Sequence, residues 1–369
     1  MNFPAPSLKG ILPDSDDEED GLGTLPSLNS TSKSAAEQMQ ESFMLSQSGT
    51  FKMQDFKLNA QGLAFVDIGD AESEKRPAAA SPGSVEVTSM AELETLEELG
   101  SGASGVVFKM KHKPTGEIVA VKQVTILEKP KREQVVSELK IMRKHQCPWL
   151  VALYNAFYEE AKVYTILEFM DAGSLADLVN KHPSGLTDER ELGKIGMQLL
   201  NGLHYLHRQH HQVHRDLKPA NVMLNSKGAV KISDFGISSQ LDSTAGMCET
   251  FVGTTCYMAP ERLSGDRYSY SSDIWSFGLI MLELASGRYP YKKANSYFEL
   301  LGQIMDQDAP HCPEGDLSDF FGEFVGLCLD KEPARRPAAR DLLKHPWLRQ
   351  YPVMDDLLLS GLLEGMSLG

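Results

Sequence analysis

The chain has 369 residues, 41% of them hydrophobic, which is enough for two domains or lobes and for a substantial core that needs no disulfides. A formal net charge of −15 argues against a protein that binds nucleic acid or is held on a membrane surface by basic patches. The five cysteines are scattered and have no CxxC spacing, which argues against a disulfide framework and against a zinc site.

Residues 1–90 differ from the rest of the chain in composition. They contain 6 Lys or Arg against 14 Asp or Glu, and the run Asp14–Asp20 is almost entirely acidic. Such a segment repels itself and has little apolar surface to bury. We therefore predict a largely disordered tail, residues 1–90, with a regulatory or docking role.

One part of this tail, residues 42–67, has a different character. It contains apolar side chains that could anchor it to a surface: Phe51, Phe56, Leu58, Leu63 and Phe65. This segment could bind the chain's own folded domain, bind a partner, or be only a sticky linker. The sequence leaves these interpretations open.

A glycine-rich sequence opens the periodic part of the chain, which starts near residue 91. It reads GxGxxGxV, with Gly100, Gly102, Gly105 and Val107 at the fixed positions. A dinucleotide-binding fingerprint would need a helix next, whereas the following segments read as strands joined by a turn. We predict a β-hairpin whose glycine backbone closes over the phosphates of ATP.

Lys122 ends the strand sequence VAVK and needs a partner, because an isolated strand lysine is usually an exposed edge charge. The predicted helix at 131–144 supplies one in Glu138. We predict that Glu138 holds Lys122 over the α- and β-phosphates. If the helix swings away, Lys122 loses this carboxylate, so the pair could serve as a switch.

Two further apolar strands are predicted around 150–157 and 163–169. They lead to a connection, Glu168 to Met170, whose backbone we expect to bond the adenine ring. Ala120 and Met223 would form the apolar faces above and below the ring. Ala120 and Met223 could instead be ordinary core residues, and only the flanking motifs favour a role in binding adenine.

The stretch Val213–Gly236 concentrates the residues that phosphoryl transfer requires. It carries HRDxKxxN followed by DFG, a match at too many positions for an accidental cluster of charges. We predict that Asp216 accepts or orients the proton of a substrate hydroxyl and that Lys218 lies beside the transferred phosphoryl group. Asn221 and Asp234 are predicted to bind two Mg²⁺ ions.

Helical periodicity predominates after the connection from Glu168 to Met170, which we call the hinge, and predicts a mainly helical second lobe. The helical segments are at 174–180, 189–208, 296–306 and 319–330. Two further residues are expected to act structurally. Asp273 should bond the backbone around Asp216, and Arg336 should pair with Glu261.

The polar stretch between DFG and APE contains Thr244 and Thr250. Phosphate on these threonines could order the stretch, with Arg215 as its guanidinium partner. A polar loop with unmodified threonines is the alternative.

Residues 93–348 resemble the protein kinase catalytic domain, and several motifs are similar to those of MAP kinase kinases. These motifs are HRDLKPANVML with Lys218, TFVGT before YMAPER, CPWLVALYNAFY and FMDAGSL. The five residues between Thr244 and Thr250 resemble the spacing of plant-type members. The segment at 42–63 also resembles the one that precedes the kinase domain in a plant-type subgroup.

The resemblance implies an α+β, bilobal protein-kinase fold, with a β-rich N-lobe and a mainly helical C-lobe. It implies an ATP- and Mg²⁺-dependent, dual-specificity kinase that phosphorylates Thr and Tyr in the TxY loop of a MAP kinase. An upstream MAP kinase kinase kinase would activate it at Thr244 and Thr250. The family's basic docking motif is weak here, because only Lys9 precedes Ile11 and Leu12.

Three alternatives remain: a sterile-20-like serine/threonine kinase, a non-catalytic scaffold with a kinase fold, and an interaction module dominated by the tail. We predict a tail at 1–90, a kinase domain at 91–348 and a short C-terminal tail at 349–369, with repeated leucines but no assigned role. No signal peptide or long apolar run is recognisable, so we expect a cytoplasmic protein that does not bind membranes and could also enter the nucleus. We also expect a monomer that does not bind nucleic acid.

Overall fold

The structure is a computed structural model. It describes residues 44–45, 50–53, 56–65, 85–102, 105–144, 147–234, 256–266, 268–292, 294, 296–312, 315, 317–351, 359, 361–363 and 366. Thr244, Thr250, Lys9 and the acidic run Asp14–Asp20 lie outside these residues, so the predictions made for them stay predictions.

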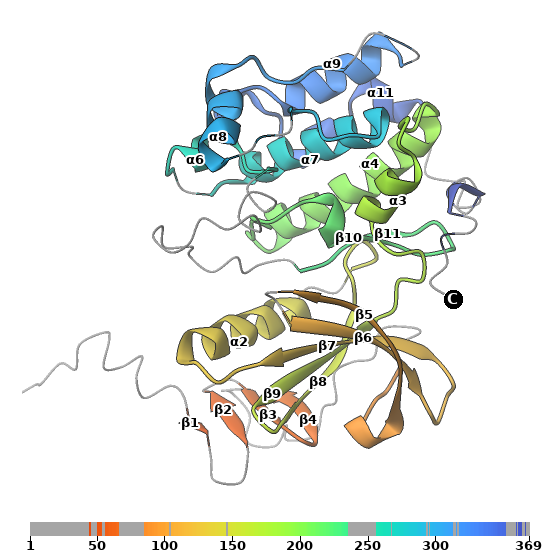
Figure 1. The fold of residues 1–369 in the computed structure, drawn as a ribbon, viewed down its shortest axis with the longest axis vertical. Helices are drawn as coiled ribbons and strands as arrows, with labels where there is room; N and C mark the ends of the chain where they lie inside the picture. Colours follow the sequence, from red (N-terminus) through yellow and green to blue (C-terminus); the bar gives the residue numbers. More distant parts are fainter. Residues whose placement is uncertain are drawn as a thin grey trace, which may run out of the picture. The chain divides into compact units, whose positions relative to one another are not determined.

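A five-stranded antiparallel sheet with the order β5-β6-β7-β9-β8 and the helix α2 form the first lobe (Figure 1). The bounds are β5 Leu93–Gly102, β6 Gly105–His112, β7 Ile118–Thr125, α2 Lys129–Lys144, β8 Leu153–Glu159 and β9 Lys162–Glu168. The strands predicted on either side of the glycine-rich sequence are confirmed as β5, β6 and β7.

The side chains of β7 alternate between the two faces of this sheet, as the period of a strand requires. Val119 and Val121 are fully buried in an apolar cluster on one face. Ala120 and Lys122 alternate with these two valines along the strand and therefore point to the other face. The apolar cluster thus supports the strand that carries Lys122.

A second, four-stranded antiparallel sheet precedes the first in the sequence. Its strands are β1 Met44–Leu45, β2 Phe51–Met53, β3 Phe56–Asn59 and β4 Gly62–Phe65. β3 and β4 lie against β8 (Figure 1), and Leu58 of β3 is 1% exposed. The part of the apolar segment at 56–65 therefore packs on the chain's own folded domain.

The second lobe is mainly helical, as predicted. The larger helices are α3 Leu175–Lys181, α4 Glu189–His204, α7 Tyr270–Ser286, α8 Tyr297–Asp306 and α9 Asp319–Cys328. Shorter helices are α6 Pro260–Leu263, α10 Ala339–Leu342 and α11 Pro346–Arg349. A π-helical turn, Tyr205–Gln209, continues α4, and β10 Val222–Leu224 pairs with β11 Val230–Ile232.

Serine caps begin several of these helices. Ser174 accepts from the backbone N–H of Asp177, whose carboxylate accepts from the backbone N–H of Ser174, so α3 begins with a capping box. Ser296 and Ser318 cap α8 and α9 in the same position. Local side-chain bonds therefore fix where these helices begin.

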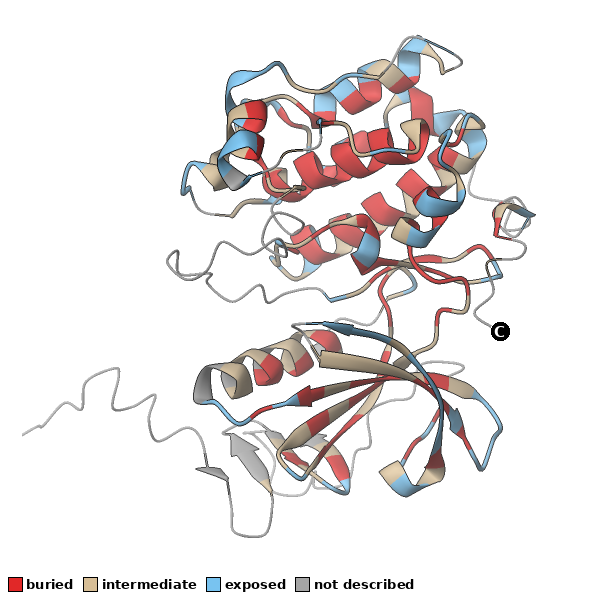
Figure 2. Ribbon diagram, viewed as in Figure 1, coloured by how far each residue is buried: buried red, intermediate tan, exposed pale blue. Residues whose placement is uncertain are grey.

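The core of the second lobe is built around α7, whose residues from Ser272 to Ala285 are all buried. Figure 2 shows this helix as a continuous buried element with α4 and α9 beside it. At its end Gly287 adopts φ +68, the left-handed conformation that stops a helix. α7 thus forms a rigid base beneath the loop that carries Asp216.

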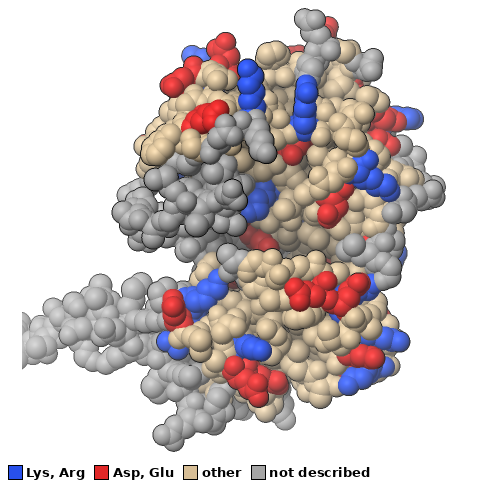
Figure 3. All heavy atoms as spheres, in the orientation of Figure 1, with Lys and Arg blue, Asp and Glu red and all other residues tan. Residues whose placement is uncertain are grey.

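Acidic and basic side chains are interspersed on the face that Figure 3 shows. None of the described helices is long and apolar enough to cross a membrane. Among the described residues, the four cysteines form no disulfide.

Candidate active site

Lys122 lies at the centre of the first group of polar contacts. Its Nζ atom is 2.9 Å from Glu138 Oε1 on α2 and 2.6 Å from Asp234 Oδ1, which follows β11. Burial alone would lower the pKa of Lys122, but the two carboxylates outweigh it and raise the pKa above its ordinary value. The predicted ion pair with Glu138 is thus present, and Lys122 also joins the two lobes.

Asp234 is held as a carboxylate in this group. Burial alone would raise the pKa of Asp234. The charge of Lys122 and the hydrogen bond from that residue outweigh burial and hold the pKa below its ordinary value. Its side chain still has 41% of its surface exposed, and its φ of +49 lies in the left-handed region. An ionised carboxylate with part of its surface exposed is suited to binding a cation.

A second group of contacts surrounds Asp216. Lys218 Nζ donates to Asp216 Oδ2 at 2.8 Å, and Asn221 Nδ2 donates to the same oxygen at 3.0 Å and to the Asp216 carbonyl at 2.8 Å. Asn221 sits in a short 3-10 turn, Pro219–Asn221. The three residues predicted from HRDxKxxN are therefore in direct contact.

Asp273 of α7 fixes this loop from below, as predicted. Its carboxylate accepts from the backbone N–H of His214 at 2.8 Å and of Arg215 at 3.0 Å, and it lies 2.7 Å from His207 Nε2. Burial would raise the pKa of Asp273, but these donors lower it. Arg215 has φ +74, so the bonds to Asp273 hold a strained turn in place.

The glycine-rich hairpin closes between β5 and β6, with Gly102 opposite Gly105 and Gly100 opposite Val107. Gly105 has φ +127, and a Cβ atom placed on it would lie 2.4 Å from the carbonyl oxygen of Gln123. Position 105 therefore requires glycine for both conformation and space. Apart from the adjoining residues of the chain, no heavy atom of the described residues lies within 4 Å of a Cβ built on Gly100 or Gly102.

The predicted adenine-binding residues lie around the end of β9. Ala120 pairs with Leu167, one residue before Glu168, and Met223 forms an isolated bridge with Ser174 just beyond the hinge. Ala120 and Met223 are both half-buried, so they retain surface for a ligand. Met170 is 3% exposed, so its side chain belongs to the core.

The Glu168 side chain has a partner that was not predicted from the sequence. Lys231 Nζ lies 2.7 Å from both carboxylate oxygens of Glu168, and Glu168 Oε2 also accepts from the backbone N–H of Ala152. Lys231 stands three residues before Asp234 on β11. The sequence VKISDFG held a signal for this ion pair, because a lysine on a strand so near DFG needs a partner.

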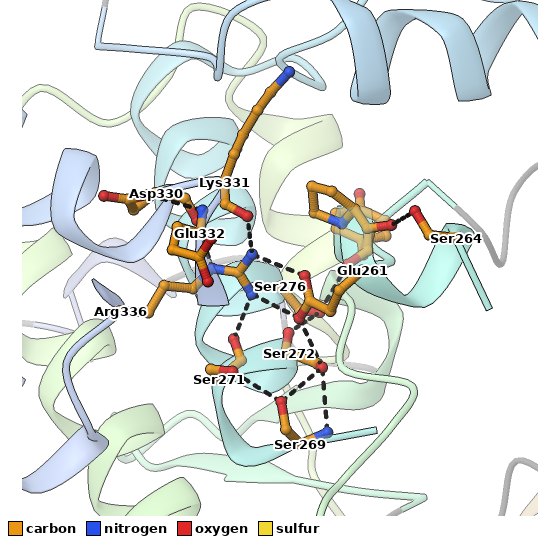
Figure 4. A network of polar contacts seen from close by, with 12 residues as sticks. Glu261, Ser264, Ser269, Ser271, Ser272, Ser276, Asp330, Lys331, Glu332 and Arg336 are labelled. Carbon is orange, nitrogen blue, oxygen red and sulfur yellow. Dashed lines mark hydrogen bonds and ion pairs between the residues drawn. The ribbon is translucent and has the colours of Figure 1, made fainter. Parts of the chain in front are cut away.

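Arg336 forms the predicted pair with Glu261 (Figure 4). Its Nη1 and Nη2 atoms lie 2.8 and 2.9 Å from the two carboxylate oxygens of Glu261, and it also donates to the carbonyl of Ser271. Burial would raise the pKa of Glu261, but Arg336 lowers it. The pair anchors α6, which follows the segment containing Thr244 and Thr250, to the base of the lobe.

The sequence and the fold can be compared with known families. Residues 93–348 match the protein kinase domain family, which is more than half of the chain. The chain is therefore a protein kinase, an enzyme that transfers phosphoryl groups.

Similarity to individual proteins shows which group of protein kinases the chain belongs to. The chain is 42% identical over 316 residues to mitogen-activated protein kinase kinase 2 of Arabidopsis thaliana, covering 83% of this chain and 85% of that protein. It is 39% identical over 318 residues to the mitogen-activated protein kinase kinase SIPKK of Nicotiana tabacum, covering 84% and 87%. It is 38% identical over 323 residues to the dual specificity mitogen-activated protein kinase kinase dSOR1 of Drosophila melanogaster, covering 80% of each. This kinase belongs to the MAP kinase kinases.

Membership of the protein kinases implies ATP as substrate and Mg²⁺ as the usual metal. The residues fit that requirement. Asn221 and Asp234 offer oxygen atoms, while the described residues contain no cluster of three or more His, Cys, Asp or Glu side chains that would form a complete metal cage. Mg²⁺ commonly binds in this way, through one or two protein ligands plus phosphate oxygens and water.

Proposed function

We propose that this MAP kinase kinase transfers the γ-phosphoryl group of ATP to both the Thr and the Tyr of the TxY loop of a MAP kinase. Two groups of contacts support phosphoryl transfer most strongly. In the first, Lys122 contacts Glu138 and Asp234. In the second, Asp216 contacts Lys218 and Asn221. All six residues are those that phosphoryl transfer requires.

The nucleotide would lie between the glycine-rich hairpin and the hinge. The backbone at Gly100, Gly102 and Gly105 would cover its phosphates, with Val107 beside them, and the backbone from Glu168 to Met170 would bond adenine. Ala120 and Met223 are half-buried on either side of this position. Lys122 would pair with the α- and β-phosphates, oriented by Glu138.

The chemistry follows from charge and position. Asp216 orients the substrate hydroxyl and accepts its proton, while Lys218, 2.8 Å from it, neutralises charge on the transferred group. Mg²⁺ held by Asn221 and Asp234 would neutralise the phosphate oxygens. Because the transition state spreads negative charge over the phosphoryl oxygens, positioning and charge account for most of the catalysis.

We also propose that a MAP kinase kinase kinase activates this chain by phosphorylating Thr244 and Thr250. Arg215 is exposed and stands directly before Asp216, so a phosphate that binds its guanidinium would act on the catalytic loop. Its guanidinium lies 5.6 Å from the ring centroid of Tyr268, which Arg262 also approaches, at 3.5 Å.

Phosphosite mapping by mass spectrometry tests the proposal. A panel of catalytically inactive MAP kinases is incubated with magnesium-ATP and the Thr244→Asp/Thr250→Asp variant, with Asp216→Ala added as the blank. We expect one or a few panel members to acquire phosphate on both the Thr and the Tyr of the TxY loop. Phosphate confined to serine or threonine on unrelated proteins would instead support a sterile-20-like kinase.

A further inference from the structure

The hairpin formed by β3 and β4, residues 56–65, is docked on the first lobe at β8. Leu58 of β3 is only 1% exposed. Gly62, with φ +114, closes the turn, and a Cβ atom on it would lie 3.1 Å from Asn155 Nδ2. The hairpin therefore fits closely against Asn155 of β8.

Asn155 connects three segments through one amide group. Its Oδ1 atom accepts from the backbone N–H of Leu63 on the hairpin at 3.2 Å and from that of Ala156 at 2.8 Å. Its Nδ2 atom donates to the carbonyl of Val87 at 2.8 Å. The pairing of β8 with β9 shifts register between Leu153 and Asn155, which is where this side chain is turned to its partners.

The segment around Val87, residues 85–92, forms a strap across the outer face of the main sheet. Val85 and Val87 are 6% and 2% exposed and join the apolar cluster that contains Val119 and Val121. A capping box between Ser89 and Glu92 orders the second half of the strap internally. Asn155 bonds the first half, at the carbonyl of Val87.

A line of contacts thus runs from the hairpin to the active site. Leu63 bonds Asn155, which bonds Val87, which packs in one cluster with Val121. Val121 is the immediate neighbour of Lys122 and faces away from it on β7. A loose strap would therefore leave the strand that carries Lys122 without support on its outer face.

We propose that the hairpin at 56–65 is an intramolecular clamp: through Asn155 it holds the strap at 85–92 against β7 and so keeps Lys122 in position for ATP. Asn155 is a positioning residue in this arrangement. This proposal rests on the proposed role of Lys122 in binding ATP. The docking of the hairpin on β8 is independent of that role.

Hydrogen exchange on the full chain tests the docking without any nucleotide. The variant Leu58→Ser changes only the hairpin, and Leu127→Ser, at a leucine that is 72% exposed, is its matched control. We expect amides at 56–65 to be protected in the wild type, and Leu58→Ser to reduce protection there, at 85–92 and along β7. Absence of protection at 56–65 in the wild type would overturn the clamp. So would a Leu58→Ser variant that loses protection only within the hairpin.

Kinetics then test the effect on Lys122. We expect Leu58→Ser and Asn155→Ala each to raise KM for ATP by roughly twofold to thirtyfold, with a smaller change in KM for the protein substrate. Asn180→Ala, an exposed asparagine on α3, is the control for Asn155→Ala. An unchanged KM for ATP in Leu58→Ser, with the hairpin shown by exchange to be released, would overturn the positioning role. If the wild type transfers no phosphate, the proposed function fails, and the exchange experiment still decides the docking.

Discussion

Lys231 Nζ lies 2.7 Å from both carboxylate oxygens of Glu168, so the strand before Asp234 is tied to the hinge by an ion pair. Both side chains are largely buried, with 14% and 19% of their surface exposed. Removing one partner leaves the other charge poorly solvated, so Lys231→Met should lower the free energy of unfolding by about 1–3 kcal/mol. Urea denaturation measures this.

The matched control for this change is Lys227→Met, an exposed lysine in the turn between β10 and β11. It should leave the unfolding free energy within about 0.5 kcal/mol of the wild type. Equal stability of the Lys231→Met and Lys227→Met variants would show that the ion pair has no net effect on the fold.

Lys122→Met should abolish most activity while the fold persists. The variant removes the ammonium between Glu138 and Asp234 and with it a fixed positive charge at the phosphates. We expect kcat/KM to fall roughly 100- to 1000-fold. Lys111→Met, an exposed lysine on β6, should retain wild-type kinetics. Substantial phosphoryl transfer by Lys122→Met would contradict the assignment.

Gly105→Ala should be far more disruptive than Gly102→Ala. A Cβ atom at position 105 meets a backbone carbonyl at 2.4 Å in a left-handed conformation, whereas that at position 102 meets no described atom within 4 Å. We expect Gly105→Ala to cost roughly 1–3 kcal/mol of unfolding free energy. Thermal melting of both variants gives the comparison, and similar melting temperatures would argue against the hairpin geometry.

Glu92 should make the first lobe sensitive to acid. The side-chain and backbone hydrogen bonds from Thr88 are the main cause that lowers the pKa of Glu92 from 4.5 to about 2. A lowered pKa in the folded state contributes stability that is complete above the ordinary value of 4.5 and is lost as pH falls toward 2. Glu92→Gln should therefore be less stable than the wild type near neutral pH.

The difference between Glu92→Gln and the wild type should shrink as pH falls through this range. Melting temperatures across the range measure it, with Glu94→Gln, an exposed neighbour on β5, as the control. If the difference in melting temperature between Glu92→Gln and the wild type stays constant as the pH falls to about 2, Glu92 acts through packing and not through its charge.

The sequence was informative wherever chemistry constrains several residues at fixed spacing. The contacts of Lys122 with Glu138, of Asp216 with Asn221, and of Arg336 with Glu261 were expected from motif positions, and the structure shows each. The strands around the glycine-rich sequence followed from its alternating pattern in the same way.

Contacts between distant segments that carry no recognisable motif were not accessible. Asn155 and Val87 are 68 residues apart, and Asn155 and Leu63 are 92 apart. Nothing in the local pattern of an asparagine within a strand reveals such partners. The strap at 85–92 was likewise missed, because two buried valines beside an acidic tail are too short a signal to place a segment on a sheet.

The number and position of phosphates added to one catalytically inactive MAP kinase test the central claim most directly. The protein is incubated with magnesium-ATP and the Thr244→Asp/Thr250→Asp variant, and its intact mass is followed over time. We predict two added phosphates, on the Thr and the Tyr of the TxY loop, and none when Asp216→Ala is introduced into the same variant. A loop that stays unmodified across the MAP kinase panel, or equal labelling with the Asp216→Ala form, would contradict the account.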